Sequence, residues 1–156
     1  MILVTVGIQL PFPRLISAMD KIAETLEEKV IAQIGSQTKK PLYMETVDEL
    51  APEEFEKQMT NARVIVSHVG GGTILTAQRL KKPLIVFPRQ AKLLEHRNDH
   101  QLDTARNLDN LEGIYVAWSE KQLEELVQRN DLIPAGSHNS KERVQLVNRL
   151  KQFIDE

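Results

Sequence analysis

Three consecutive glycines, Gly70, Gly71 and Gly72, follow an apolar run and precede Thr73 and a helix-like segment. A loop that leads from a strand into the first turn of a helix presents free backbone N–H groups and the positive end of the helix dipole. These groups together can bind an anion, and glycines allow a phosphate to approach the backbone. The hydroxyl of Thr73 adds a further hydrogen-bonding group. The same glycines also fit a tight turn that only requires positive φ or close packing.

This glycine loop (residues 70–73) matches neither of two common nucleotide-binding motifs. Leu75 stands where the third glycine of GxGxxG belongs, and no Lys-Ser or Lys-Thr pair follows the glycines as in a P-loop. The sequence also lacks a GxSxG elbow, and Ser67 has no neighbouring base other than His68, so a serine hydrolase is not favoured. His68 itself is a candidate catalytic group and equally a candidate structural hydrogen-bonding residue.

A second polar cluster, EHRNDHQ, occupies residues 95–101 after another apolar run. A ligand cleft forms where two such loops meet at one edge of a sheet, so this polar block is a candidate for ligand contacts. His96 and His100 are four residues apart and could bind zinc with Glu95 or Asp99 if they shared a helical face. The block does not match HExxH, however, and it could equally form a turn in which one of its side chains caps the next helix.

The hydrophobic pattern places both clusters at strand ends. Apolar and β-branched runs predict strands, and apolar residues three and four apart predict helices between them. This alternation predicts an α/β fold with a parallel, Rossmann-like sheet, helices on both faces and ligands beyond the carboxyl ends of the strands. The predicted strands are residues 2–6, 30–34, 42–47, 64–66, 84–87 and 114–117. The predicted helices are residues 12–28, 52–60, 73–80, 99–108, 119–129 and 141–154.

Composition narrows the classes of function. The 156 residues suit a single domain, with residues 131–140 as a linker-like loop before a terminal helix. The 20 basic and 22 acidic side chains give a formal net charge of −2, which does not favour nucleic-acid binding. The absence of cysteine excludes disulfides and thiolate metal sites and fits the cytoplasm. The sequence has no signal-peptide features and no apolar run near the roughly 20 residues that cross a bilayer.

Several segments, in consistent order over about residues 1–130, resemble one known family. They are VTVGIQLPFPRLISAMD, VIAQIGS, VIVSHVGGGTIL, and KPLIVFPR with EHRNDHQLDTA. The chain resembles the C-terminal, donor-binding half of family 28 glycosyltransferases, especially the stand-alone form in PssE-like exopolysaccharide subunits. MurG carries the same half fused to an acceptor domain. The resemblance implies the C-terminal half of a GT-B fold, which binds the nucleotide diphosphate of a UDP-sugar.

The resemblance also implies a set of substrate-binding residues. The backbone of the glycine loop would hold the diphosphate, and His100 and Gln101 would lie beside the donor sugar and ribose. Thr76 stands where MurG-type loops place a ribose-binding glutamate, so the charge-assisted part of that interaction is lost. Ile8 stands at a position that is usually threonine. The implied residues are Gly7, Gln9, Gly35, Ser36, Gly70, Gly71, Gly72, Thr73, Thr76, Glu95, His96, Arg97, Asn98, Asp99, His100 and Gln101.

The function implied by the resemblance is that of a UDP-sugar-binding catalytic subunit of a two-subunit inverting glycosyltransferase in polysaccharide or glycolipid synthesis. A membrane-anchored PssD-type partner would supply a lipid-linked acceptor, which would place the chain in the cytoplasm, peripheral to the inner face of the plasma membrane. No cofactor or metal is expected, because a helix N-terminus can stabilise departing UDP and no DxD pair suits magnesium. The alternative is a non-catalytic nucleotide-sugar-binding or scaffold subunit. A sugar-nucleotide epimerase is less suitable because it needs both halves in one chain.

Two apolar segments could contact such a partner. One is Leu10-Pro11-Phe12-Pro13 and the other is the apolar stripe of the terminal helix, unless both are buried in the domain's own core. An isolated chain could also form a homo-oligomer.

Overall fold

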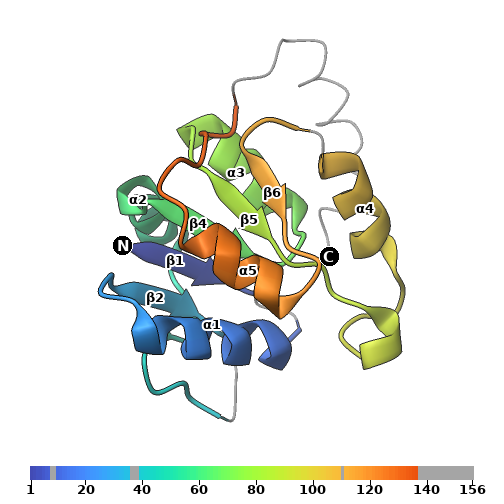
Figure 1. Ribbon diagram of the computed structural model, residues 1–156, viewed down its shortest axis with the longest axis horizontal. Helices are drawn as coiled ribbons and strands as arrows, with labels where there is room; N and C mark the ends of the chain where they lie inside the picture. Colours follow the sequence, from blue (N-terminus) through green and yellow to red (C-terminus); the bar gives the residue numbers. More distant parts are fainter. Residues whose placement is uncertain (8–9, 36–38, 110, 137–156) are drawn as a thin grey trace.

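The computed structural model describes residues 1–7, 10–35, 39–109 and 111–136. Within them, parallel strands form one six-stranded sheet in the order β3-β2-β1-β4-β5-β6 (Figure 1). The strands are β1 (Ile2–Thr5), β2 (Val30–Gln33), β3 (Glu45–Val47), β4 (Val64–Ser67), β5 (Leu84–Val86) and β6 (Ile114–Val116). The helices are α1 (Pro13–Thr25), α2 (Pro52–Asn61), α3 (Gly71–Leu80), the short 3₁₀ helix η1 (Ala91–Leu93), α4 (His100–Leu108) and α5 (Glu120–Val127).

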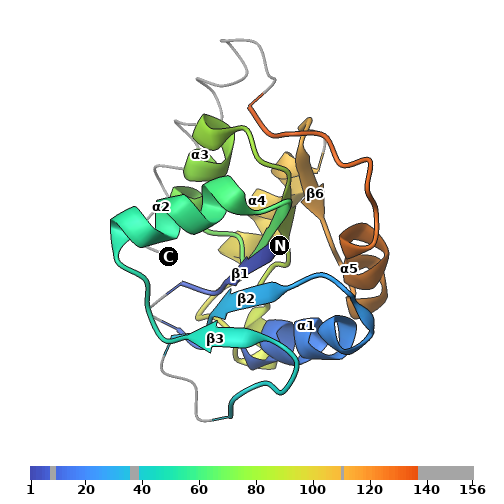
Figure 2. The ribbon, with the colours of Figure 1, turned by 90° about the vertical axis from the view of Figure 1, so that its left-hand side faces the viewer.

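The helices cover both faces of the sheet, and each face has its own apolar core. Side chains alternate along a strand, so Ile2 and Val4 of β1 enter one core while Leu3 enters the other. The first core receives α1 and α5, and the second receives residues of α2, α3 and α4. Figure 2 shows α1 and α5 on one side of the sheet and α2 and α3 on the other. The fold class predicted from the sequence is therefore confirmed.

Two predicted helix starts, at Pro52 and Ser119, are observed, whereas the helix predicted from Thr73 begins at Gly71. Pro52 lies in the first turn of α2, where its missing N–H has no cost. The hydroxyl of Ser119 accepts a hydrogen bond from the N–H of Gln122 at 3.1 Å and so caps α5. The predicted helix at 141–154 lies outside the described residues, as do residues 137–140 of the linker-like loop.

The predicted strand 42–47 is shortened to Glu45–Val47. The N–H groups of Leu42 and Tyr43 donate to the carboxylate of Asp20 on α1, at 3.1 and 2.8 Å, instead of joining the ladder with β2. The side chain of Leu42 is 83% exposed as a result. No helix in the described ranges is both long enough and apolar enough to cross a membrane.

Gly113, which leads into β6, supplies a test of the packing around the sheet edge. Its φ is +84°, and a β-carbon there would lie 2.4 Å from the backbone of Ala135. We expect Gly113→Ala to lower the free energy of unfolding by about 2–4 kcal/mol, because the new methyl group meets backbone that cannot rotate away. Urea unfolding measures the change. The control is Glu112→Ala, which replaces the exposed residue before Gly113. Equal free energies of unfolding for the two variants would contradict the expectation.

Candidate functional site

Loops from three adjacent strands, β1, β4 and β5, meet at the carboxyl edge of the sheet. The loop after β4 contains the glycines, and the loop after β5 contains the polar block. Figure 1 shows the loop between β5 and α4 projecting beyond the sheet. Ligands of parallel α/β sheets bind beyond this edge, so the structure brings the two polar clusters of the sequence to the expected side.

The glycine loop opens directly into the first turn of α3. Gly70 is the N-cap, with φ −118° and ψ 127°, and it provides no side-chain cap. The N–H of Ile74 bonds to the carbonyl of Gly70 at 3.1 Å. Within the described parts of the chain, the N–H groups of Gly71, Gly72 and Thr73 have no hydrogen-bond acceptor. These amides, at the positive end of the helix dipole, are suited to an anion.

Two glycines of this loop, Gly70 and Gly72, differ in what surrounds them. A β-carbon at Gly70 would lie 2.6 Å from Nε2 of His68, so the imidazole ring excludes a side chain there. Apart from its chain neighbours and its own helix, a β-carbon at Gly72 would meet no atom of the described residues within 4 Å, so that part of the chain leaves the space beside Gly72 open. The tight-packing interpretation therefore explains Gly70, and the space that a bound group could occupy lies at Gly72.

His68 is a buried neutral ring that separates two loops. It is 4% exposed and lies against Gly70 and also against Gly7, where a β-carbon would be 3.1 Å from Cε1 of the ring. The pKa of His68 is lowered from 6.5 to about 3, mainly because burial disfavours the charged ring and also because Arg89 is positive, while a hydrogen bond to the backbone of Thr5 acts in the opposite direction. Such a group is a poor general base near neutral pH.

The hydroxyl of Ser67 makes no hydrogen bond to the imidazole of His68, as a serine nucleophile would. It donates to the carbonyl of His68 at 2.7 Å, so the Ser67–His68 pair lacks the hydrogen bond of a serine hydrolase.

Gln101 joins the glycine loop to the loop after β5. Its Oε1 accepts hydrogen bonds from the N–H groups of Val69, at 3.3 Å, and Arg89, at 3.1 Å. The side chain is 1% exposed, and its Nε2 has no partner within the described residues. Gln101 therefore lies next to the glycine loop, and its Nε2 amide group makes no hydrogen bond to the described residues.

Arg89, which the sequence did not single out, connects the loop after β5 to the segment after β1. It is 2% exposed, and its terminal nitrogens donate to the carbonyls of Val6, Leu10, Pro11 and Glu95 at 2.7, 2.8, 2.7 and 3.3 Å. Its guanidinium also lies 4.7 Å from the centre of the Phe12 ring. Burial lowers its pKa to about 10, which the negative Glu95 partly opposes, so it is charged at neutral pH.

Three acidic or amide side chains of the polar block are engaged within the protein. Glu95 forms a bidentate ion pair with Arg14, at 2.8 and 2.9 Å, and accepts the N–H of Gln90 at 3.1 Å. Asp99 accepts the N–H of Ala91 at 2.8 Å. Asn98 accepts the N–H of His100 at 3.0 Å, but the N-cap of α4 is Asp99, which makes no side-chain capping hydrogen bond.

The histidines of the block do not share a helical face. His100 begins α4, whereas His96 precedes the helix and its Nδ1 accepts the N–H of Asn98 at 3.4 Å. The two histidines therefore do not lie on one helical face, as the zinc alternative requires. In the described part of the chain, no three His, Asp or Glu side chains form a metal-binding group. Arg97, in contrast, is exposed to solvent.

The remaining residues implied by the resemblance lie around the same edge where they are described. Gly7 and Gly35 have φ of +77° and +65°, and a β-carbon at Gly35 would lie 3.6 Å from the carbonyl oxygen of Gly7. The hydroxyl of Thr76 donates to the carbonyl of Gly72 at 2.8 Å. Ile8, Gln9 and Ser36 lie outside the described residues.

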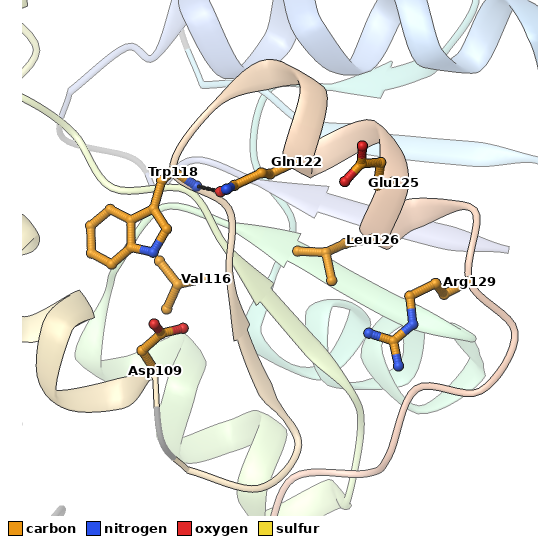
Figure 3. A pocket seen from close by; sticks show the side chains of 7 residues that line it. All are labelled: Asp109, Val116, Trp118, Gln122, Glu125, Leu126 and Arg129. Atoms are coloured by element: carbon orange, nitrogen blue, oxygen red, sulfur yellow. Dashed lines mark hydrogen bonds between the residues drawn. The ribbon is translucent and has the colours of Figure 1, made fainter.

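Two surface grooves are lined by residues outside the glycine loop. A groove of about 350 Å³ lies beside β6. Figure 3 shows Trp118 at one end of its lining residues and Arg129 at the other. Its remaining lining residues are Asp109, Val116, Gln122, Glu125 and Leu126. A second groove, of about 520 Å³, is lined by Glu53, Glu56, Lys57, Thr60 and Asn61 of α2. Neither brings together residues of the three loops.

The parallel sheet and the glycine loop at its carboxyl edge define a Rossmann-like domain of the class that forms one half of GT-B glycosyltransferases. Residues 1–155 match the glycosyltransferase family 28 C-terminal domain, and the chain belongs to this family.

A relative of known name shares part of the sequence. The chain is 36% identical over 77 residues to the UDP-N-acetylglucosamine transferase subunit ALG13 of Candida albicans strain SC5314. The aligned part is 49% of this chain and 25% of that protein, so the chain matches about a quarter of its relative.

Solved structures share the fold. The NMR solution structure of ALG13 superimposes with a TM-score of 0.66 at 22% identity and covers 96% of each chain. MurG of Acinetobacter baumannii gives a TM-score of 0.60 at 16% identity, covering 98% of this chain and 48% of MurG. The kitacinnamycin glycosyltransferase gives 0.59 at 16% identity, covering 99% of this chain and 38% of that enzyme.

The hydrogen bonds of Arg89 predict a large loss of stability on its removal. We expect Arg89→Met to lower the free energy of unfolding by about 3–5 kcal/mol, because the carbonyls of Val6, Leu10 and Pro11 lose a charged donor. Chemical denaturation measures this change. The control is Arg79→Met, which removes an exposed guanidinium paired with Glu56 and should change stability little. If both substitutions lower the free energy of unfolding by similar amounts, the hydrogen bonds of Arg89 do not stabilise the two loops.

His68 predicts a specific dependence of stability on pH. Its folded pKa lies below the unfolded value of 6.5, so the unfolded chain binds a proton first as the pH falls. Between about pH 6.5 and 5 this residue should cost up to about 1.4 kcal/mol of stability per pH unit. Urea titrations at several pH values should therefore show a shallower decline for His68→Gln than for wild type. Parallel curves would contradict the low pKa.

Proposed function

We propose that this chain binds the diphosphate of a UDP-sugar and serves as the donor-binding subunit of a two-subunit glycosyltransferase. The observation that carries the proposal is the open start of α3, where the amides of Gly71, Gly72 and Thr73 have no acceptor in the described chain and no other described residue fills the space beside Gly72. Membership of the family 28 C-terminal domain family and the similarity to a UDP-N-acetylglucosamine transferase subunit support a UDP-sugar as donor.

The proposed reaction is an inverting transfer. An acceptor hydroxyl attacks the anomeric carbon of the sugar, the bond from that carbon to the diphosphate oxygen breaks, and UDP leaves with the bonding electrons. Negative charge grows on the diphosphate during this step. The N–H groups and the dipole of α3 are already oriented toward that charge, so they stabilise it without reorganisation. We propose that no additional cofactor or metal is needed.

The proton of the acceptor hydroxyl must pass to a base. His68 does not suit this role, because its lowered pKa leaves it with little affinity for a proton. We propose that the base belongs to a separate PssD-type subunit that also holds the lipid-linked acceptor. That arrangement would place this chain at the cytoplasmic face of the plasma membrane through its partner. The 48% coverage of MurG agrees with a chain that corresponds to one half of a two-domain enzyme.

A scaffold subunit without donor binding is the second candidate. The observation that favours it is the hydroxyl of Thr76, which donates to the carbonyl of Gly72 rather than facing a ligand. A ribose contact from this side chain would require that hydrogen bond to be exchanged. The two candidates differ in whether this chain binds UDP.

Gly72→Asp separates donor binding from folding. A carboxylate in the first turn of a helix is favourable for the helix dipole, and apart from its chain neighbours and its own helix a β-carbon at this position meets no described residue within 4 Å. The same carboxylate repels a diphosphate. We therefore expect unchanged or slightly higher stability and an affinity for UDP that is at least about tenfold lower, measured by calorimetry.

Ala51→Asp is the matched control, because it adds the same charge at the N-cap of α2. Its affinity for UDP should stay within about twofold of wild type. In a reconstituted complex, Gly72→Asp should also abolish sugar transfer. Undiminished transfer, or a wild-type chain that binds no UDP, would favour the scaffold.

A further inference from the structure

The last layer of the sheet is polar on one face, although the layer before it is apolar. The strand register places Gln33 of β2 beside Thr5 of β1, and Thr5 beside Ser67 of β4, so these three side chains project from one face. All three are buried, and together they form the polar row. Two positions earlier on each strand, the residues of this face belong to the second apolar core; they are Leu3, Ile31 and Ile65.

The polar row lies on the face and at the edge where α3 begins. Residues of α2 and α3 pack on this face, and an ion pair between Arg79 and Glu56, 2.8 Å long, joins the two helices. Figure 2 shows α2 and α3 together on one side of the sheet. Each of these helices begins soon after a strand ends, so both N-termini are at the carboxyl edge. The row is therefore on the same side of the sheet as the open amides of the glycine loop.

The row also crosses the point where the strand order reverses. In the order β3-β2-β1-β4-β5-β6, successive strands of the chain lie outward from β1 in one direction and outward from β4 in the other. Parallel α/β sheets bind ligands beyond the strand ends at such a point. Thr5 and Ser67 flank it, and Gln33 lies one strand further from the glycine loop. A nucleotide with its diphosphate at the glycine loop passes over the row if its nucleoside extends toward β2.

The nucleoside has less space in the opposite direction, toward β5. The loop after β5 is bonded directly to the glycine loop, since Oε1 of Gln101 accepts the N–H groups of Val69 and Arg89. Both Gln101 and Arg89 are buried, so protein atoms fill that side. In the loop after β2, a β-carbon at Gly35 would lie within 4 Å of one described atom beyond its chain neighbours, the carbonyl oxygen of Gly7. Among the described residues, the path over β2 is the less crowded.

Gln33 has a hydrogen-bonding group that the described protein does not use. Its side chain is 5% exposed, and its Oε1 accepts no hydrogen bond from the described residues. The hydroxyl of Ser67, in contrast, donates to the carbonyl of His68 at 2.7 Å. Burying an amide oxygen without a hydrogen-bond donor costs free energy. A ligand that supplies the missing N–H or O–H group removes this cost.

We propose that Gln33 is a substrate-binding residue that accepts a hydrogen bond from the nucleoside of the UDP-sugar. This inference rests on the proposed function, which assigns the diphosphate to the glycine loop. An amide oxygen accepts from a ribose hydroxyl or from the N3–H group of uracil, whereas an ionised phosphate has no such group to donate. Gln33 therefore recognises the neutral part of the nucleotide, and the amides of α3 recognise its charge.

Gln33→Met tests the proposal in the full chain. Methionine has a similar length and no amide, so this variant should be at least as stable as wild type in urea, because a buried oxygen without a donor is removed. Its affinity for UDP, measured by calorimetry, should fall about three- to tenfold. Its affinity for inorganic pyrophosphate, measured by competition with UDP, should stay within about twofold of wild type.

Gln78→Met is the matched control. Gln78 is also a buried glutamine, and neither polar atom of its amide has a partner in the described chain. It lies near the C-terminal end of α3, where a β-carbon at Gly136 would be 2.4 Å from its carbonyl oxygen. This end of the helix is opposite to the glycine loop, so the substitution should leave the affinity for UDP within about twofold of wild type.

Equal affinities of wild type and Gln33→Met for UDP would overturn the role of Gln33. An equal loss for UDP and pyrophosphate would also overturn it, because the substitution would then act through the glycine loop. A wild-type chain that binds no UDP would remove the proposed function itself, which keeps the two failures distinct.

Two analogues locate the contact within the nucleoside. If Gln33 accepts from the ribose 2′-hydroxyl, wild type and Gln33→Met should bind dUDP equally. If it accepts from uracil, they should bind CDP equally, because cytosine has no N3–H group. A loss that persists with both analogues assigns the contact to the 3′-hydroxyl. Each of these results supports the proposal, since each requires Gln33 to contact the nucleoside.

Discussion

The arrangement of the site depends on one buried cation. Arg89 has no described carboxylate among its hydrogen-bond acceptors; backbone carbonyls from two loops solvate its charge instead. Removing such a cation from water is costly, and the cost is recovered only while those carbonyls stay in place. The segment after β1 and the loop after β5 are consequently held in one relative position. The hydrogen bonds of this charged group fix the relative position of the two loops more narrowly than apolar packing alone would.

His68 and Gln101 complete the connections that Arg89 begins. The ring of His68 lies between Gly7 and Gly70, and the amide oxygen of Gln101 joins the backbone of the glycine loop to that of Arg89. Each pair among the three loops is therefore linked by one buried polar side chain. Fixed loops keep the amides at the start of α3 oriented before any ligand arrives, which is the condition under which dipoles stabilise developing charge most effectively.

The sequence predicted the sheet, its helices and the glycine loop because each depends on a local pattern. It could not predict Arg89, since arginine is usually exposed and several of its acceptors lie 78 to 83 residues earlier in the chain. The same limit applies to the polar block. Its composition indicated ligand contacts, whereas Glu95 and Asp99 bind groups within the protein, a choice that only the packed loops determine. Gly70 and Gly72, indistinguishable in the sequence, differ because of the ring of His68.

The charge of Arg89 acts beyond the atoms that it contacts. It contributes to the low pKa of His68, so its positive potential reaches the ring directly beneath Gly70. Both side chains are buried, so solvent screens that potential only weakly. If a diphosphate binds at the glycine loop as proposed, the charge of the buried Arg89 would attract it without any lysine or arginine at the surface of the site.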